Sequence, residues 1–362
     1  MLITNLNLTN YRSYSTLDLE LSKGVSIFIG KNGEGKTNIA ESILYLTFLN
    51  SHRASGNTPL IKLGNQAAYI RAKVKYPERE ILVELEINAE KANRAKINQN
   101  PVRSQKEIFG IVQSIYFSPE DLDIVRGDPS ERRRFIDQLL TLRSPRIAAL
   151  VSDYERAVKQ RNSLLKTRAP NDGLAPWDKQ VADFGGQLIA QRMEVLAQLT
   201  PIFNEVYKDI SNTKASQIIY KSSIENPSLN SKENTDKIME KLLNNRGAEL
   251  ERGLTLTGPH RDDLTLMLGE HLVKGYASHG ESWSIALSLK LATYQLLKSD
   301  GLSPILILDD VFSELDEERR EKLAQLAQSA EQTIITVAVE NDLPKSLTGA
   351  KYLVKSTMVS KL

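Results

Sequence analysis

The sequence predicts an α/β protein in which a part made of mixed strands and helices is interrupted by a helical insertion. Residues 25–49 read as an apolar strand, a glycine-rich loop and a helix. Residues 305–310 read as a second apolar strand, which ends in two carboxylates. From Pro129 to about Leu250, between these stretches, long amphipathic helical patterns replace the alternating strand patterns. The parts before and after the insertion therefore have to fold together as one domain.

The composition is that of a globular protein without thiol chemistry. The chain has 362 residues, which allows two or three domains or one divided domain, and 41% of them are hydrophobic, which is enough for a normal core. It contains no cysteine, which excludes disulfides and thiolate metal sites, and its four histidines lack zinc-ligand spacing. No apolar run approaches the ~18 residues of a membrane span, and the first residues lack the basic start of a signal peptide. We therefore expect a cytoplasmic protein.

The N-terminal part reads as β-structure. Residues 2–29 predict three strands, and in one of them Leu17, Leu19 and Leu21 alternate with acidic residues, as in a half-buried antiparallel strand. The further strands expected before the helical part are 68–76 and 80–87, split at Pro77 as a hairpin, then 94–100 and 111–117.

The loop at residues 30–37 fits G-x-x-x-x-G-K-[ST] at every position. A buried-type strand precedes it and a helical pattern follows it, which is the order that a phosphate site needs. Its glycines let backbone N–H groups converge on one anion, aided by the helix dipole. Lys36 is expected to reach the β- and γ-phosphates, and Thr37 to ligate Mg²⁺. The predicted nucleotide-binding residues are Gly30, Lys31, Asn32, Gly33, Glu34, Gly35, Lys36, Thr37 and Asn38.

Helical patterns dominate the insertion and strand patterns return after it. The expected helices of the insertion are 132–142, 147–165 and 177–204, with polar breaks at 168–176 and 221–235. The elements expected after it are strands at 254–256, 264–268, 304–308, 333–339 and 351–354, and helices at 281–298 and 317–330.

The strand at residues 305–310 is expected to supply the rest of the Mg²⁺ site. A strand that ends in Asp beside a phosphate loop commonly provides the second metal ligand. We assign Asp309 to the metal, directly or through water, and Asp310 to polarising the attacking water. The alternative is an acidic helix cap after a buried strand.

A second anion site is predicted at residues 276–282. Ser278 and Gly280 form a Ser-x-Gly turn before an amphipathic helix, and Glu281 follows them. A helix N-terminus favours anions through its free N–H groups and its dipole. One chain with two such sites suggests a composite pocket, in which Ser278 and Gly280 of one protomer close on the γ-phosphate held by another. As a simple helix cap, however, the turn would be unremarkable.

The charge distribution suggests a polyanion as partner. The net charge is only +2, but residues 52–106 and residues 126–168 each carry eleven Lys or Arg against five Asp or Glu. The alternative is that these segments are helices exposed to solvent that simply carry many arginines. No aromatic residues interleave with the cations, so nothing supports the stacking of bases. A nucleic acid partner would be bound through its phosphates, without sequence preference. The candidate contacts for it are Arg53, Arg71, Lys73 and Lys75, then Arg132, Arg133 and Arg134, which could instead tie the insertion to the rest of the chain.

In this order, the phosphate loop, the Ser-His-Gly-Glu turn, the Asp-Asp strand end and the acidic turn after it resemble an ABC-type ATPase head of the SMC-like branch. More closely, the chain resembles from end to end the RecF family of bacterial DNA replication and repair proteins. Besides the phosphate loop, the resemblance is carried by 10–14 (NYRSY), 117–122 (FSPEDL), 127–137 (GDPSERRRFID), 257–264 (TGPHRDDL), 276–284 (YASHGESWS) and 308–316 (LDDVFSELD).

The resemblance implies an ATPase lobe I of residues 1–115 and 255–362 and a helical lobe II of residues 116–254. It implies ATP and Mg²⁺ as cofactors, an ATP-dependent head-to-head homodimer on double-stranded or gapped DNA at the nucleoid, and weak ATP hydrolysis, expected to be stimulated by DNA. Its implied partners are RecR and, indirectly, RecO and RecA, for loading RecA at single-strand gaps in repair, replication and the SOS response. Ser278, Gly280 and Glu281 match the signature motif that meets ATP in trans, Asp316 matches the D-loop, and Arg12 matches a basic residue near the phosphates.

Three departures from the general ABC pattern predict slow hydrolysis. Asp310 stands where Glu is usual, and Ala338-Val339-Glu340 stand where a switch histidine is expected. Gln113 and Glu120 are both imperfect candidates for the lid glutamine. We expect a turnover number below about 10 s⁻¹.

Other functions fit less well. The insertion is too short for the coiled coil of a full SMC protein, no guanine-binding motif is present, and the basic segments argue against a transporter ATPase. The remaining alternative is a DNA-binding scaffold in which ATP only gates the dimer and hydrolysis is not required.

Overall fold

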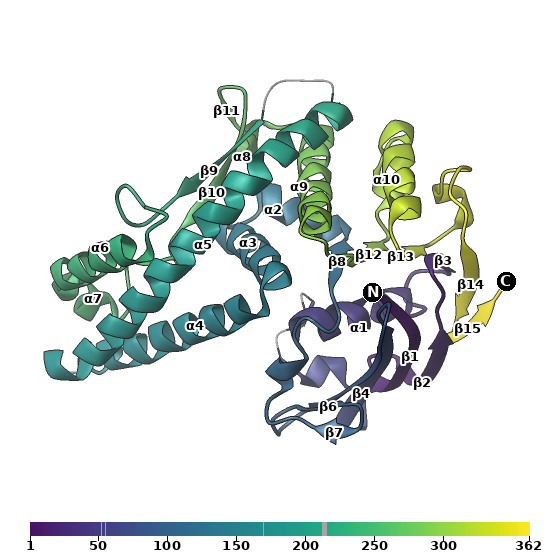
Figure 1. Ribbon diagram of the computed structural model, residues 1–362, viewed down its shortest axis with the longest axis horizontal. Helices are drawn as coiled ribbons and strands as arrows, with labels where there is room; N and C mark the ends of the chain where they lie inside the picture. Colours follow the sequence, from purple (N-terminus) through teal and green to yellow (C-terminus); the bar gives the residue numbers. More distant parts are fainter. Residues whose placement is uncertain (52, 55, 169, 212–215) are drawn as a thin grey trace. The chain divides into compact units, whose positions relative to one another are not determined.

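The computed structural model describes residues 1–51, 53–54, 56–168, 170–211 and 216–362. The chain divides into two compact units (Figure 1). The first unit combines Met1–Asp121 with Leu297–Leu362 and contains the phosphate loop. The second unit, Leu122–Leu296, is mainly helical.

The first sheet of the first unit is antiparallel throughout, in the order β2-β1-β4-β5-β6-β7. Leu17 and Leu19 of β2 are buried while Asp18 and Glu20 are exposed, which confirms the alternating strand predicted from the sequence. The predicted hairpin is also confirmed, because β4 pairs with β5. The bounds are β1 (Leu2–Tyr11), β2 (Tyr14–Glu20), β4 (Ala67–Lys75), β5 (Glu80–Asn88), β6 (Arg94–Ile97) and β7 (Asn100–Pro101).

The second sheet carries the phosphate loop, in the order β15-β14-β3-β13-β12-β8. All neighbours are parallel except β14 and β15. The loop therefore follows β3 at the same sheet edge where β12 and β13 end, since parallel strands share their carboxyl edge. The bounds are β3 (Gly24–Ile29), β8 (Ser114–Phe117), β12 (Ile305–Asp309), β13 (Gln332–Val337), β14 (Ala350–Lys355) and β15 (Met358–Lys361), with helices α1 (Lys36–Phe48) and α10 (Glu317–Ser329).

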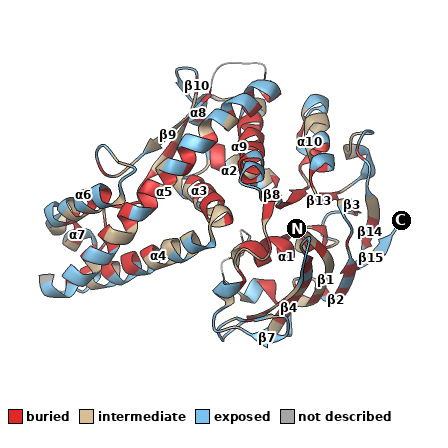
Figure 2. Ribbon diagram, viewed as in Figure 1, coloured by how far each residue is buried: buried red, intermediate tan, exposed pale blue. Residues whose placement is uncertain are grey.

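One hydrophobic cluster joins both sheets to α1. It includes Leu6 and Ile70 from the antiparallel sheet, Ile307 and Ile334 from the parallel sheet, and Ile43 from α1. Figure 2 shows α1 buried over most of its surface, as expected for a helix with apolar neighbours on several sides. This packing fixes the helix that begins at the phosphate loop.

The second unit packs helices around a three-stranded antiparallel sheet, β11-β10-β9. Its helices are α2 (Leu122–Arg126), α3 (Pro129–Arg143), α4 (Pro145–Lys166), α5 (Asn171–Ser211), α6 (Ser231–Asn244), α7 (Arg246–Arg252), α8 (Val273–Tyr276) and α9 (His279–Ser299), and its strands are β9 (Ser216–Lys221), β10 (Asp263–Leu268) and β11 (His271–Leu272). Among the residues that the structure describes, no helix is both long and apolar enough to cross a membrane.

A buried ion cluster joins the helices of this unit. Arg161 of α4 is fully buried and donates to Asp178 of α5 at 2.7 Å, to Glu249 of α7 at 2.5 Å and to the hydroxyl of Thr255 at 2.9 Å. Removing one member of such a cluster leaves an uncompensated buried charge.

Three expectations for the insertion and its end are wrong. Residues 254–256 are not a strand, because the N–H groups of Thr255 and Leu256 donate to the side chains of Asn162 and Glu249. The part expected to be helical contains a strand, β9, which pairs with β10. Both expected polar breaks are shorter than predicted, because α5 begins at Asn171 and α6 begins at Ser231.

The compact units divide the chain at residues 121–122 and 296–297, whereas the sequence predicts lobe boundaries at 115–116 and 254–255. The second boundary lies later in the chain than predicted because β10, which follows residue 255, pairs with β9 of the helical unit. The assignment of residues 255–296 to the ATPase lobe stays a prediction.

Candidate active site

The phosphate loop has a backbone that glycine makes possible. Gly33 and Gly35 have φ values of 86° and 107°, in the left-handed region. A Cβ atom at Gly30 would lie 2.2 Å from the carbonyl oxygen of Val354 on β14. The loop thus packs closely against the neighbouring strand before it turns into α1.

The Lys36 side chain lies over the loop. Its Nζ donates to the carbonyl oxygens of Gly30, at 2.5 Å, and Lys31, at 3.1 Å. Burial lowers the pKa of the ammonium, while the carboxylates of Asp310 and Asp309 act in the opposite direction. Lys36 therefore lies within the electrostatic influence of both carboxylates that the sequence assigned to the site.

Asp309 connects the end of β12 to the start of α1. Thr37 Oγ1 donates to Asp309 Oδ1 at 3.1 Å, and the hydroxyl of Tyr116 on β8 donates to Oδ2 at 2.6 Å. The Thr336 hydroxyl on β13 also donates to Oδ1. Burial and the Asp309 carboxylate raise the pKa of Tyr116 well above its ordinary value, so Tyr116 remains a donor.

The oxygen atoms of Thr37 and Asp309 fit a magnesium ion. The Thr37 hydroxyl donates its proton to Asp309, so its lone pairs remain available for a cation. Oxygen atoms of this kind are the ligands that Mg²⁺ prefers. Within the described part of the chain, no group of three or more His, Cys, Asp or Glu residues forms a complete metal cage. Mg²⁺ usually binds through one or two protein oxygens together with phosphate and water.

Asp310 follows directly in a constrained backbone conformation. Its φ is 57°, and its N–H donates to both the carbonyl oxygen and the hydroxyl oxygen of Thr336, each at 3.1 Å. Burial raises the pKa of the Asp310 carboxyl, the Lys36 ammonium lowers it and Asp309 raises it further. A carboxylate with a raised pKa is a stronger base, which suits a group that polarises water.

The turn between β1 and β2 contacts α1 through side chains that sequence reasoning did not pair. The Arg12 guanidinium makes hydrogen bonds of 2.8 and 2.6 Å to the carboxylate of Glu41, which is fully buried. It also donates to the carbonyl oxygen of Pro59 at 2.9 Å. The signal that could have identified this pair is the position of Glu41 among the apolar residues of the helical pattern, because a buried carboxylate needs a cationic partner. The expected contact of Arg12 with phosphate stays a prediction.

Two further contacts join this turn to the loop end of α1. The Asn38 amide donates to Ser13 Oγ at 2.8 Å, and the Tyr14 hydroxyl donates to the carbonyl oxygen of Gly35 at 3.3 Å. The NYRSY segment therefore supports the phosphate loop and the first turns of α1.

The Ser-x-Gly turn is the cap of α9. The N–H of Ser278 donates to the Glu281 carboxylate at 2.8 Å, and the N–H of Glu281 donates to Ser278 Oγ at 3.2 Å, which is a capping box. The helix-cap interpretation is thus confirmed. Ser278 is exposed and Gly280 is partly exposed, and their contact with a nucleotide in trans stays a prediction.

Asp316 caps a helix as well. Its Oδ1 accepts from the N–H of Arg319 at 3.0 Å, and its carboxylate forms an ion pair with the Arg319 side chain, both at the start of α10. The D-loop role of Asp316 stays a prediction.

The candidate DNA contacts of the antiparallel sheet share its outer face with acidic residues. Lys73 and Lys75 are exposed, whereas Arg71 pairs with Glu84 at 3.2 Å and also donates to Asn7. Arg53 is exposed outside the sheet. This face is therefore of mixed charge, which the net charge of the segment did not reveal.

The three consecutive arginines contact residues within the helical unit. Arg132 is buried and makes two hydrogen bonds, of 2.7 and 3.0 Å, to the carboxylate of Asp263. Arg133 donates to the Asp262 carbonyl oxygen at 2.8 Å, and Arg134 pairs with Glu131 on its own helix. Arg132 thus fixes α3 to β10, and its geometry does not favour the predicted contact with DNA.

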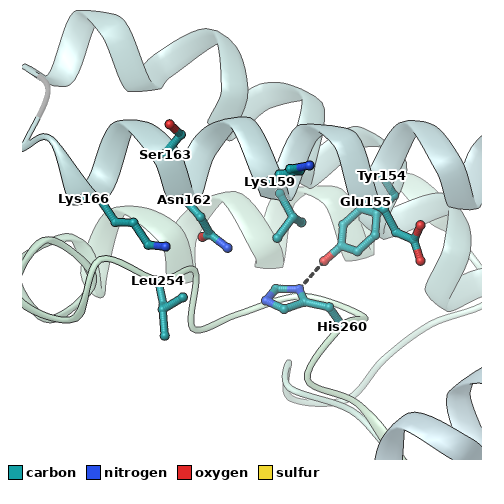
Figure 3. Close-up of a pocket in the computed structure, with 9 residues that line it drawn as sticks. Tyr154, Glu155, Lys159, Asn162, Ser163, Lys166, Leu254 and His260 are labelled. Atoms are coloured by element: carbon teal, nitrogen blue, oxygen red, sulfur yellow. Dashed lines mark hydrogen bonds between the residues drawn. The ribbon is translucent and has the colours of Figure 1, made fainter. Parts of the chain in front are cut away.

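A groove of about 460 Å³ is lined mainly by residues of α4 in the helical unit, together with Leu254 and with His260 of the segment TGPHRDDL (Figure 3). The His260 ring accepts at Nδ1 from the Tyr154 hydroxyl at 2.6 Å and donates from Nε2 to the Thr255 carbonyl oxygen at 3.0 Å. Burial lowers the pKa of His260 to about 4, so the ring is neutral at pH 7. A Cβ atom at Gly258 would lie 2.4 Å from the Tyr154 hydroxyl oxygen, so the close approach requires glycine.

Comparisons with known proteins agree with this geometry. The family described as the RecF/RecN/SMC N-terminal domain matches residues 2–361. The DNA replication and repair protein RecF of Streptomyces avermitilis is 45% identical over 100% of both chains. The RecF protein of Cutibacterium acnes is 42% identical over 97% of this chain and 96% of its own.

Solved structures give the same result. The recombination mediator protein RecF with ATPrS, in the RecFOR pathway, has a TM-score of 0.91 at 28% identity and covers 100% of this chain and 98% of its own. An Smc head bound to the C-winged helix domain of ScpA has a TM-score of 0.59 at 16% identity, with coverage of 99% and 96%, and shows likeness of fold alone. The predicted ABC-type ATPase head fold is confirmed.

Proposed function

Because the chain belongs to the RecF/RecN/SMC N-terminal domain family, we propose that it is an ATP-dependent DNA-binding protein of recombinational repair. The observation that carries this proposal is the hydrogen bond between Thr37 and Asp309, which joins the phosphate loop to the strand that supplies the second metal ligand. ATP would be held by the loop N–H groups and Lys36. Mg²⁺ would be held by Thr37 and by Asp309, directly or through water.

The proposed chemistry is a weak ATP hydrolysis. Asp310 accepts hydrogen bonds from the attacking water and increases its nucleophilicity, while Lys36 stabilises negative charge on the phosphates. Asp310 is one methylene shorter than glutamate, so it holds a water less closely. Hydrolysis is therefore slow, and DNA is expected to stimulate it.

The proposed working form is a head-to-head homodimer that closes on DNA. The exposed turn at Ser278 supports this, because its helix N-terminus can meet a γ-phosphate held by a second protomer. DNA is held through its phosphates, which makes the affinity dependent on salt and largely independent of sequence. A solved RecF structure is described within the RecFOR pathway, which supports RecR as a partner, with RecO and RecA engaged indirectly at single-strand gaps.

Substituting Asp310 distinguishes a hydrolysing clamp from an ATP-gated scaffold. Asp310→Asn should bind ATP and dimerise like the wild type but lose most of its hydrolysis. Glu90→Gln, which makes the same change from carboxylate to amide at an exposed residue after β5, is the control. If Asp310→Asn cells survive ultraviolet damage as wild-type cells do, hydrolysis is not required and the scaffold function replaces the clamp.

A further inference from the structure

Thr336 lies beside both acidic residues of the site. It is on β13, in register with Asp309 on the neighbouring strand β12, and it is fully buried. No motif in the sequence marks it, because its position depends on the order of the strands in the sheet.

The hydroxyl group of Thr336 contacts both acidic residues. Its one proton is donated to Asp309 Oδ1, and its oxygen accepts the N–H of Asp310 at 3.1 Å. The same N–H also donates to the Thr336 carbonyl oxygen at 3.1 Å. A buried hydroxyl with one donor and one acceptor contact of this kind has a fixed orientation, and both contacts end on the pair of acidic residues.

The second oxygen of Asp309 is held from the other side of β12. Tyr116 on β8 donates to Oδ2 at 2.6 Å, and the strand order β13-β12-β8 places the two hydroxyl groups on opposite sides of the carboxylate. Hydrogen bonds to both oxygens stop the carboxylate from rotating, so the oxygen facing the phosphate loop is fixed.

We propose that Thr336 is a positioning residue that sets the orientation of both Asp309 and Asp310, with Tyr116 holding the other oxygen of Asp309. The proposal rests on the proposed function, since it concerns the metal ligand and the water-polarising group of that site. Thr336 acts in two ways. Its hydroxyl donates to the Asp309 carboxylate, and its hydroxyl and carbonyl oxygens accept the N–H of Asp310, which holds Asp310 in a left-handed conformation with a φ of 57°.

The test compares Thr336→Val, which keeps the shape and removes the hydroxyl, with Thr336→Ser, which keeps the hydroxyl. Thr333→Val is the matched control, because Thr333 is also buried on β13 but its hydroxyl donates to the Ala327 carbonyl oxygen. The measurements are kcat and KM for ATP hydrolysis, and ATP affinity by calorimetry with Mg²⁺ and with EDTA.

Thr336→Val should lower kcat about tenfold, the effect of losing one hydrogen bond that orients a reacting group. It should also lose most of the gain in ATP affinity that Mg²⁺ gives the wild type, while its affinity in EDTA stays within about twofold. Thr336→Ser and Thr333→Val should resemble the wild type in all these measurements.

Two results would overturn the positioning role: wild-type kcat and Mg²⁺ dependence in Thr336→Val, or equal defects in Thr336→Ser and Thr336→Val. A wild-type protein that binds ATP without hydrolysing it would contradict the proposed function instead. The calorimetry then still decides the role of Thr336 toward the metal ligand.

Discussion

The Arg12 guanidinium and the Glu41 carboxylate form a two-pronged ion pair, with hydrogen bonds of 2.8 and 2.6 Å. The Glu41 side chain is fully buried and also accepts from Ser51 at 2.6 Å. The pair joins the turn after β1 to α1. Any role of Arg12 toward a nucleotide therefore has to operate from this anchored position.

Glu41→Gln should destabilise the first unit by about 3 kcal/mol, because it leaves the Arg12 charge without its partner in a largely buried place. Urea unfolding followed by circular dichroism measures the change. Glu84→Gln, which removes an acidic partner of Arg71 on the exposed sheet face, is the control and should cost less than about 1 kcal/mol. Equal losses in the two variants would show that the Arg12–Glu41 pair is no more important than a surface ion pair.

The state of His260 makes the stability of the helical unit depend on pH. Its pKa of about 4 in the folded protein lies below the ordinary value of 6.5, so the unfolded chain binds the proton more tightly. The contribution of the neutral His260 ring to the free energy of unfolding is therefore fully present above pH 6.5 and is lost as the pH falls toward 4. The loss between pH 7 and pH 5 should be roughly 2 kcal/mol.

Comparison with His260→Gln isolates this contribution, because glutamine does not titrate while all other groups do so in both proteins. Chemical unfolding at pH 7 and pH 5 should show a smaller loss in the variant than in the wild type. The same loss in both proteins would mean that His260 does not have a lowered pKa.

The two exposed lysines of β4 test the DNA surface. If Lys73 and Lys75 each neutralise one DNA phosphate, then replacing both by Ala should reduce the slope of log affinity against log salt by about 1.8. Fluorescence anisotropy with a labelled duplex at several salt concentrations gives this slope. Replacing Lys179 and Lys232, exposed lysines of the helical unit, makes the same charge change and should leave the slope unaltered. Equal slopes in the two double variants would remove β4 from the DNA surface.

The sequence was sufficient for those parts of the site that lie within one continuous motif. The loop at residues 30–37 and the pair Asp309 and Asp310 were found because each motif includes the strand that positions it. Thr336 and Tyr116 could not be found in this way. They reach Asp309 only because the sheet places β13 and β8 on either side of β12.

The same limit explains the errors in the helical part. The strand β9 has a short pattern of its own and is stabilised by pairing with β10, which lies more than forty residues later. Conversely, residues 254–256 alternate like a strand, but the N–H groups of Thr255 and Leu256 donate to the side chains of Asn162 and Glu249 instead of to a neighbouring strand. Arg132 was a candidate for DNA contact or for joining the two lobes, and its contact with DNA stays a prediction. Its partner Asp263, 131 residues away, could not be identified from the sequence.

The proposed dimer is driven by ATP and closes through the turn at Ser278. Sedimentation of the purified protein with Mg²⁺ should show a monomer without nucleotide and twice that mass with ATP. Ser278→Arg should remain monomeric with ATP while still binding it, because the larger cation fills the place of the γ-phosphate in trans. Gln187→Arg, an exposed change on α5, should dimerise like the wild type. A wild-type protein that stays monomeric with ATP bound, or a Ser278→Arg protein that dimerises normally, would contradict the account.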